Sequence, residues 1–188
     1  MNKELIKGLI AEYQQFVKSV SFVKRAVTLS DNFNYVFVGL RRVGKSYLMY
    51  QQIHHLIEIG ISPEEILFFN FEDERIAGMD TEHLDMIKRC YEEMYSHRPI
   101  FFLDEIQIVP HWEQFVRRLA DQKYRVYVTG SNAKMLSKDI ATTLGGRFMI
   151  QYVYPFSFRE YLSSNGVQLD KLWIYQNRSE VVLSLIHI

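Results

Sequence analysis

Residues 39–46 of this 188-residue chain read Gly-Leu-Arg-Arg-Val-Gly-Lys-Ser, and this octet limits the possible folds more than any other segment. It matches every fixed position of the phosphate-binding loop pattern G-x-x-x-x-G-K-[ST]. The apolar residues 35–38 before it indicate a buried strand, and residues 47–53 after it indicate the start of a helix. Because this loop works between a strand and a helix, the octet predicts an α/β fold with a parallel sheet.

The fixed positions of the octet each have a mechanical reason. The two glycines let the backbone wrap around a polyphosphate, so that N–H groups and the start of the helix point at the anion. Lys45 is predicted to reach the β- and γ-phosphates, and the Ser46 hydroxyl to ligate Mg²⁺. Arg41 and Arg42 occupy free positions, where they either add charge near the phosphates or form a solvated pair. The predicted nucleotide contacts are Gly39, Leu40, Arg41, Arg42, Val43, Gly44, Lys45, Ser46 and Tyr47.

Residues 100–105, Ile-Phe-Phe-Leu-Asp-Glu, form a second signature. Four apolar residues followed by two carboxylates are typical of a central parallel strand whose carboxyl end lies where ligands bind in open α/β sheets. In a P-loop nucleotidase, Asp104 would hold the Mg²⁺ shell and Glu105 would orient or deprotonate the attacking water. Alone, such a run is more often a solvated turn, but the octet about sixty residues upstream favours the catalytic interpretation.

The rest of the chain alternates between strand and helix patterns, which predicts a parallel sheet covered on both faces. We expect five strands, centred near residues 36, 68, 102, 127 and 150. Helices are predicted over residues 81–95, after Pro110 and after Pro155, where Ser157 and Glu160 form a capping box. These elements predict an α/β three-layer sandwich of the P-loop NTPase class, built on a five-stranded parallel sheet.

Five motifs together resemble the AAA+ ATPase superfamily. More narrowly, they resemble bacterial and archaeal AAA-type ATP-binding proteins in which an ATPase core precedes a C-terminal domain of unknown function. The motifs are the octet, Phe-Leu-Asp-Glu-Ile-Gln (102–107), Val-Thr-Gly-Ser-Asn (128–132), Leu-Gly-Gly-Arg (144–147) and Tyr-Pro-Phe-Ser-Phe-Arg-Glu-Tyr-Leu (154–162). The resemblance implies the strand order 5-1-4-3-2. It also implies an N-terminal helical segment (1–30), an ATPase core (31–165) and the start of a C-terminal region (166–188), the remainder of which we expect to be missing.

Two further roles follow from the resemblance alone. Asn132 or Ser131, after the fourth strand, would sense the γ-phosphate and help to place the water, although either residue could instead cap the next helix. Arg147 lies where many AAA+ subunits project an arginine finger at a neighbour's nucleotide, which implies a homo-oligomer. The alternative for Arg147 is a structural salt bridge or a charge at a helix C-terminus.

Composition narrows the remaining choices. The formal net charge is +0 and no long basic run occurs, so nucleic acid and anionic membranes are not indicated as partners. No secretory signal or spanning segment is visible, and the single cysteine, Cys90, fits a buried residue in a reducing cytoplasm. The six histidines lack the spacing of a metal site. The acidic residues 72–74 favour a solvated loop over a catalytic role.

The predicted function is therefore binding of Mg·ATP, with hydrolysis through Glu105. One alternative is a nucleotide-binding switch with negligible turnover. Another is a P-loop kinase or GTPase, but the chain has no acceptor-site motif and no Asn-Lys-x-Asp segment after the fourth strand. Residues 1–33 contain no motif that assigns adenine contacts, and nothing identifies a protein partner.

Overall fold

The computed structural model describes residues 2–131 and 142–166. In these residues, five parallel strands form one sheet in the order β2-β3-β4-β1-β5. The strands are β1 (Asn34–Gly39), β2 (Ile66–Asn70), β3 (Ile100–Asp104), β4 (Val126–Ser131) and β5 (Phe148–Tyr152). This is the predicted order 5-1-4-3-2 read from the other edge, so the predicted sheet is confirmed.

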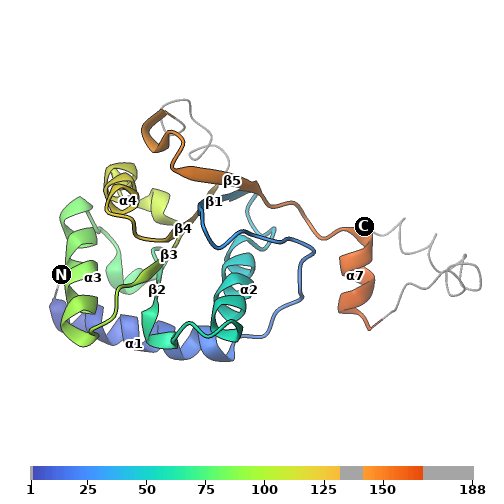
Figure 1. Cartoon of the computed structure of the whole chain (residues 1–188), viewed down its shortest axis with the longest axis horizontal. Helices are drawn as coiled ribbons and strands as arrows, with labels where there is room; N and C mark the ends of the chain where they lie inside the picture. Colours follow the sequence, from blue (N-terminus) through green and yellow to red (C-terminus); the bar gives the residue numbers. More distant parts are fainter. Residues whose placement is uncertain (1, 132–141, 167–188) are drawn as a thin grey trace, which may run out of the picture.

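Helices cover the sheet on both faces, which confirms the three-layer architecture. Figure 1 shows α2 on one side of the sheet and α3 with α4 on the other. The α-helices are α1 (Lys3–Ser19), α2 (Lys45–Glu58), α3 (Thr81–Met94), α4 (Trp112–Asp121) and α7 (Phe158–Ser164). The single-turn helices are η1 (Pro63–Glu65), η2 (Glu74–Ile76) and η3 (Ile106–Ile108). The predicted region 166–188 lies outside the described residues, except for residue 166.

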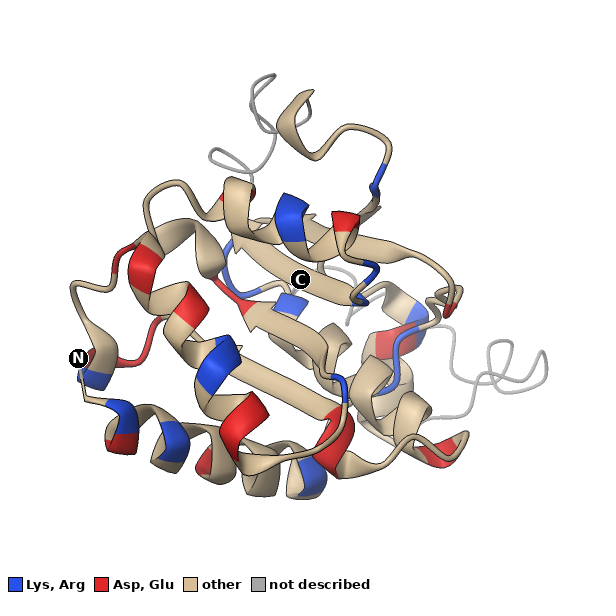
Figure 2. Cartoon of the chain, turned by 60° about the vertical axis from the view of Figure 1, so that its left-hand side comes forward, with Lys and Arg blue, Asp and Glu red and all other residues tan. Residues whose placement is uncertain are grey.

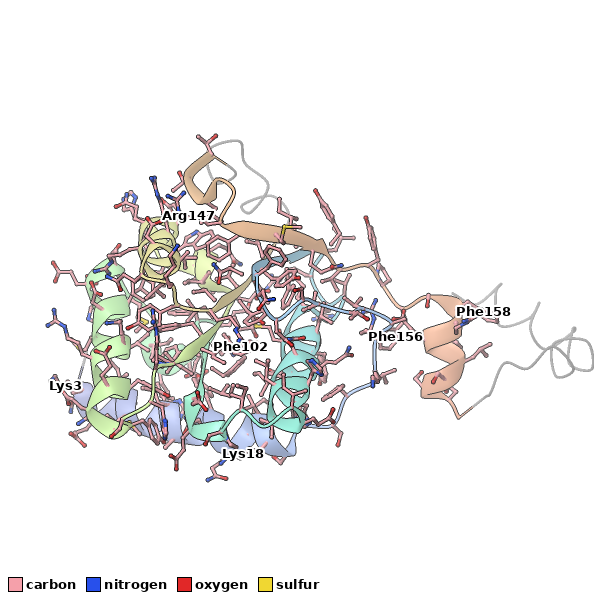
Figure 3. All side chains as sticks on the ribbon, viewed as in Figure 1. Lys3, Lys18, Phe102, Arg147, Phe156 and Phe158 are labelled. Carbon is pink, nitrogen blue, oxygen red and sulfur yellow. The ribbon has the colours of Figure 1, made fainter. Side chains whose placement is uncertain are left out.

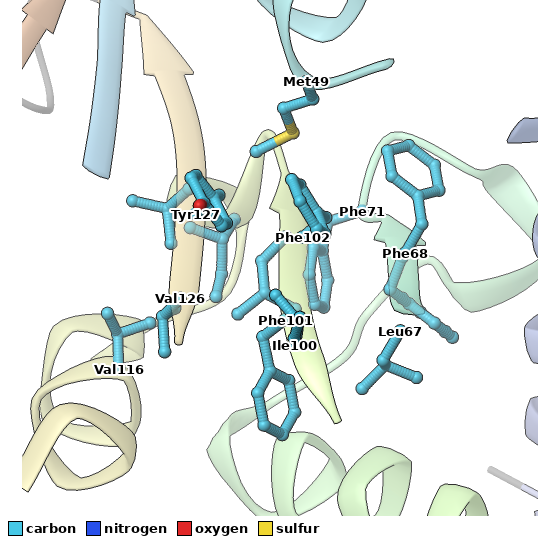
Figure 4. Close-up of a cluster of buried hydrophobic side chains, with 14 of the residues drawn as sticks. Met49, Leu67, Phe68, Phe71, Ile100, Phe101, Phe102, Val116, Val126 and Tyr127 are labelled. Carbon is cyan, nitrogen blue, oxygen red and sulfur yellow. The ribbon is translucent and has the colours of Figure 1, made fainter. Parts of the chain in front are cut away.

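The core is an aromatic-rich layer between the strands and the helices. The rings of Phe102 on β3 and Tyr127 on β4 stack with centroids 4.4 Å apart, and Tyr35 on β1 continues the stack at 5.9 Å from Tyr127. Figure 4 shows Met49 of α2 pointing toward this pair. Cys90 on α3 is fully buried, as predicted, and burial raises the pKa of its thiol. These contacts fix the central strands whose carboxyl ends carry the predicted site.

Helix α1 covers the free edge of β2. The buried Gln14 side chain donates from Nε2 to the carbonyl oxygen of Ile66 at 3.0 Å, and Tyr13 donates to Asp73 Oδ2 at 2.6 Å. Hydrogen bonds from Arg75 and Tyr13 lower the pKa of Asp73, against the opposing effect of burial. The prediction that residues 72–74 form only a solvated loop is therefore wrong for Asp73, because its carboxylate ties the helix to the sheet. Lysines and acidic residues alternate along the outer side of α1 (Figure 2).

A close backbone approach explains one glycine of the octet. A Cβ atom at Gly39 would lie 2.4 Å from the carbonyl oxygen of Val153 and 2.9 Å from Cγ2 of Val43. Gly39 therefore lets β1 pass next to the end of β5 as the chain enters the loop.

We expect Gly39→Ala to lower the free energy of unfolding by about 1–3 kcal/mol, because the added methyl group forces the backbone of residue 153 to move. Urea denaturation measures this change. The matched control is Gly8→Ala in α1, where nothing lies within 4 Å of the added Cβ. Its higher helix propensity should stabilise the protein by about 0.5–1 kcal/mol. If Gly39→Ala left the free energy of unfolding unchanged, or raised it as Gly8→Ala should, the close approach of Val153 would not be what requires glycine at position 39.

Candidate functional site

The octet forms the turn between β1 and α2. Gly44 is the N-cap of α2 with φ of 90°, a left-handed conformation that glycine adopts without strain. Arg42 is also left-handed, with φ of 64°. Because Gly44 has no side chain to cap the helix, the N–H groups of the first turn of α2 remain available for an anion.

Lys45 points back over the loop from the first position of α2. Its Nζ atom donates to the carbonyl oxygen of Leu40 at 3.1 Å and lies 3.2 Å from Oε1 of Glu105. The Lys45 and Glu105 side chains are only 4% and 14% exposed. Two residues that the sequence predicted for one site, 60 positions apart, are thus an ion pair in the structure.

Asp104 is the most buried carboxylate of the site. It is 3% exposed and accepts a hydrogen bond from the hydroxyl group of Thr129 at 2.5 Å. Burial raises the pKa of Asp104 to about 6, and the hydroxyl groups of Thr129 and Ser46 oppose the shift. A buried carboxylate next to a serine hydroxyl is the hard-oxygen donor set that Mg²⁺ prefers. The residues present therefore fit a magnesium ion.

Thr129 on β4 is a site residue that the sequence analysis missed. Its fully buried hydroxyl donates to Asp104 and accepts from the backbone N–H of Glu105 at 2.8 Å. It fixes both carboxylate-bearing residues at once. The sequence contained a pattern that could have predicted this role: Thr129 is the polar residue that ends the apolar run of β4, the strand next to β3.

Glu105 has an unusual backbone and a second polar partner. Its φ is 53°, a left-handed conformation that is costly for a residue other than glycine. Gln107 Nε2 donates to its Oε2 atom. The Glu105 carboxylate is therefore held between Lys45 and Gln107, at the point where β3 gives way to η3.

Two adjoining cavities meet at the loop. The first, of about 740 Å³, is lined largely by charged side chains, and its lining residues are Arg41, Arg42, Gly44, Lys45, Ser46, Tyr47, Glu72 and Glu105. The second, of about 600 Å³, is mainly apolar, and its lining residues are Ser21, Phe22, Val23, Arg25, Arg42, Val43, Gly44, Tyr47, Pro155 and Phe156. Arg42, Gly44 and Tyr47 line both, so the two cavities form one cleft with a charged half and an apolar half. Arg41, which is highly exposed, forms an ion pair with Glu72 at the rim of the charged half.

Arg147 lies away from this cleft within its own chain. Its backbone carbonyl accepts from the side chain of Asn34, where β1 begins, whereas the loop follows the other end of β1. Arg147 Nε donates to Asp121 Oδ1 at 2.5 Å. Figure 3 shows Arg147 between α4 and the start of β5. Asn132 lies outside the described residues, and the backbone of Ser131 pairs in register with Gly39 at the start of the loop.

Within the part of the chain that the structure describes, no helix is long and apolar enough to cross a membrane.

Known proteins similar to this chain bear on its family. A protein-family model described as "AAA domain" matches residues 31–162. The uncharacterized protein MJ1544 of Methanocaldococcus jannaschii is 31% identical over 182 residues, covering 96% of this chain and 40% of the relative. An uncharacterized protein of Haemophilus influenzae is 35% identical over 162 residues, covering 81% of this chain and 40% of the relative. The chain thus spans about two fifths of the length of these curated relatives.

A more distant likeness is to a solved structure, the closed-state reconstruction of Hsp104 with ATPγS and FITC casein. The two share 13% sequence identity with a TM-score of 0.47, over 87% of this chain and 28% of that chain. The family match covers both the octet and the Asp-Glu strand, and it agrees with the resemblance that the five motifs carry. This chain belongs to the AAA domain family of nucleotide-binding P-loop ATPases.

Proposed function

We propose that the chain binds Mg·ATP in the cleft at residues 39–46 and hydrolyses it with Glu105 as the base that activates water. The observation that carries this proposal is that Lys45, Ser46 and Glu105 line one cavity, where Lys45 and Glu105 form a 3.2 Å ion pair. Asp104 precedes Glu105 at the end of β3, and Thr129 holds both residues. The family match supports the nucleotide, and the hard-oxygen pair of Ser46 and Asp104 supports the metal. When bound, Mg²⁺ supplies charge neutralisation on the phosphates.

The apolar half of the cleft supports an adenine site. Phe22, Val23 and Phe156 line it within reach of the loop, and Tyr47 belongs to both halves. A purine base is flat and largely apolar, so aromatic and aliphatic walls suit it. No base contacts were predicted from the sequence, since Phe22 and Val23 lie in a segment without a motif and Phe156 lies more than 130 positions away from them.

Lys45 links phosphate binding to Glu105, the proposed general base. In the structure its ammonium group is shared between Leu40 and Glu105. A polyphosphate in the loop would compete for this cation, since charge-assisted contacts to phosphate are stronger than a contact to a carbonyl oxygen. Glu105 would then lose its cationic partner and be free to accept a proton from water.

The Lys45–Glu105 ion pair also favours the second candidate, a nucleotide-binding switch in which Glu105 stays paired with Lys45 and does not activate water. The two candidates differ in turnover, not in binding. A kinase or GTPase is the third candidate, and calorimetric comparison of ATP with GTP distinguishes the GTPase from the other two.

The test of the proposed site is Lys45→Ala. Removing the cation aimed at the β- and γ-phosphates should weaken Mg·ATP binding by about 2–3 kcal/mol, or roughly 30- to 150-fold in Kd. Titration calorimetry measures the affinity. Lys18→Ala, on the outer side of α1, is the control and should bind as the wild-type protein does. An unchanged affinity in Lys45→Ala would show that the loop does not hold the phosphates.

A further inference from the structure

A buried ion pair joins the segment before β1 to the last described helix. Arg25 Nε donates to Glu160 Oε1 on α7 at 2.8 Å, across 135 positions of sequence. The two side chains are 8% and 11% exposed. Burying two charges carries a desolvation penalty, and removing one partner leaves the other charge buried without compensation. Such a pair is therefore stable only where further hydrogen bonds satisfy each group.

Arg25 uses the rest of its guanidinium to hold two walls of the cleft. Nη1 donates to the carbonyl oxygen of Val43 in the loop at 3.2 Å, and Nη2 donates to that of Tyr154 at 2.8 Å. The guanidinium carbon lies 5.0 Å from the ring centre of Phe156. One side chain therefore bridges the phosphate loop and the segment that lines the apolar half of the cleft.

The backbone of Arg25 is fixed as well. Its N–H donates to Oε1 of Gln51 at 2.6 Å, and its carbonyl oxygen accepts from Nε2 of the same residue at 3.1 Å. Gln51 belongs to α2, the helix that follows the loop. The guanidinium is thus anchored to the rigid part of the fold.

Glu160 is the polar anchor of α7. Besides the bond from Arg25, its Oε1 atom accepts from the backbone N–H of Ala26 at 3.3 Å. Figure 1 shows α7 standing apart from the sheet and its covering helices. Figure 3 shows Phe156 on the chain between β5 and α7, beside the segment that precedes β1. The position of the Phe156 wall therefore depends on how α7 is held.

We propose that Arg25 and Glu160 are positioning residues for the nucleoside end of the nucleotide, because their ion pair holds residues 154–156 against the loop and so forms the apolar half of the cleft. This inference rests on the proposed function and deepens it. The phosphates are bound by the loop itself, whereas the base needs the Phe156 wall, which Arg25 contacts directly and Glu160 steadies by fixing Arg25. Loss of Glu160 should therefore affect ATP more than a phosphate chain without a nucleoside.

Glu160→Gln is the most selective change. Glutamine can keep its oxygen on the N–H of Ser157, since Glu and Gln both serve in a capping box, and it leaves Arg25 bonded to Val43. Its amide nitrogen then faces Arg25 and cannot accept from it, so both the charge and the hydrogen bond of the pair are removed. Arg25→Lys is broader, because one ammonium group cannot reproduce a fork that reaches Glu160, Val43 and Tyr154 together.

The experiment is titration calorimetry with Mg·ATP and with Mg·tripolyphosphate on the wild-type protein and both variants. We expect Glu160→Gln to weaken ATP binding about tenfold and tripolyphosphate binding by less than about twofold. Arg25→Lys should weaken both ligands, since the bond to the loop is also lost. The control is Arg159→Gln, which removes an exposed charge from the same helix and should change neither affinity. Thermal unfolding of each variant checks that the fold is retained.

The outcomes separate the inference from the proposed function. If the wild-type protein binds neither ligand, the proposed function fails and the inference fails with it. If the wild-type protein binds ATP more tightly than tripolyphosphate but Glu160→Gln retains the full affinity for ATP, only the inference is overturned. Equal weakening of both ligands by Glu160→Gln also overturns it, because the pair would then act on the loop or on the whole fold.

Discussion

Glu105→Gln should bind Mg·ATP as the wild-type protein does but hydrolyse it about two to four orders of magnitude more slowly. Glutamine has the size of glutamate and can still accept a hydrogen bond from Lys45, whose Nζ lies 3.2 Å from Oε1 of Glu105. It cannot take a proton from water at neutral pH. The loss should therefore fall on kcat and leave affinity intact, which steady-state kinetics and calorimetry measure separately.

Glu72→Gln is the matched control for this prediction. Glu72 lines the same cavity but pairs with Arg41 at the rim, so its loss should change the rate by less than about threefold. If both variants lose the same activity, the effect comes from the charge of the cavity and not from a base. If the wild-type protein shows no turnover even at high protein concentration, the nucleotide-binding switch becomes the better account.

Arg147→Ala should lower the ATPase rate of assembled subunits by about a thousandfold if Arg147 acts as a finger on a neighbour's nucleotide. Within its own chain Arg147 is far from the loop and pairs with Asp121 at 2.5 Å. Its side chain is 36% exposed, and exposed ion pairs contribute only about 0–1 kcal/mol. Assembly could therefore exchange this pair for a phosphate contact at little cost.

A mixing experiment separates the finger from the salt bridge. Arg147→Ala and Lys45→Ala proteins should each be inactive alone and recover part of the activity when combined, because an intact loop then meets an intact finger. A rate per subunit that is independent of concentration, or an Arg147→Ala variant that only melts earlier, assigns Arg147 to the structural salt bridge.

The local patterns of the sequence predicted the frame of the site well. The octet, the Asp-Glu run and the alternation of strands and helices each depend on residues close in sequence, and the structure has all of them. Contacts between distant segments were not predicted. Arg25 and Glu160 are 135 positions apart, and three of the hydrogen bonds of Arg25 go to backbone carbonyl groups, which any residue type supplies. Such contacts leave no pattern in a single sequence.

A polar residue at the end of an apolar strand can indicate a site residue, and this indication was not used in the prediction. The hydroxyl of Thr129 is buried at the end of β4, where a polar group must find a partner, and it bonds to both Asp104 and Glu105. The polar residues predicted for the site on this segment were Ser131 and Asn132, two and three positions further on. Asp73 was misread for the converse reason, since an acidic run looks solvated unless its partner, here Tyr13 on α1, is known.

A crystal structure with Mg²⁺ and a non-hydrolysable ATP analogue tests the central claim most directly. We predict phosphates within hydrogen-bond distance of the backbone N–H groups of residues 39–46 and of Lys45, with the ion on Ser46 and near Asp104. The base should lie against Phe156 in the apolar half of the cleft, and Glu105 should be released from Lys45. A nucleotide bound elsewhere, or a Lys45–Glu105 ion pair that persists with the phosphates in place, would contradict this account.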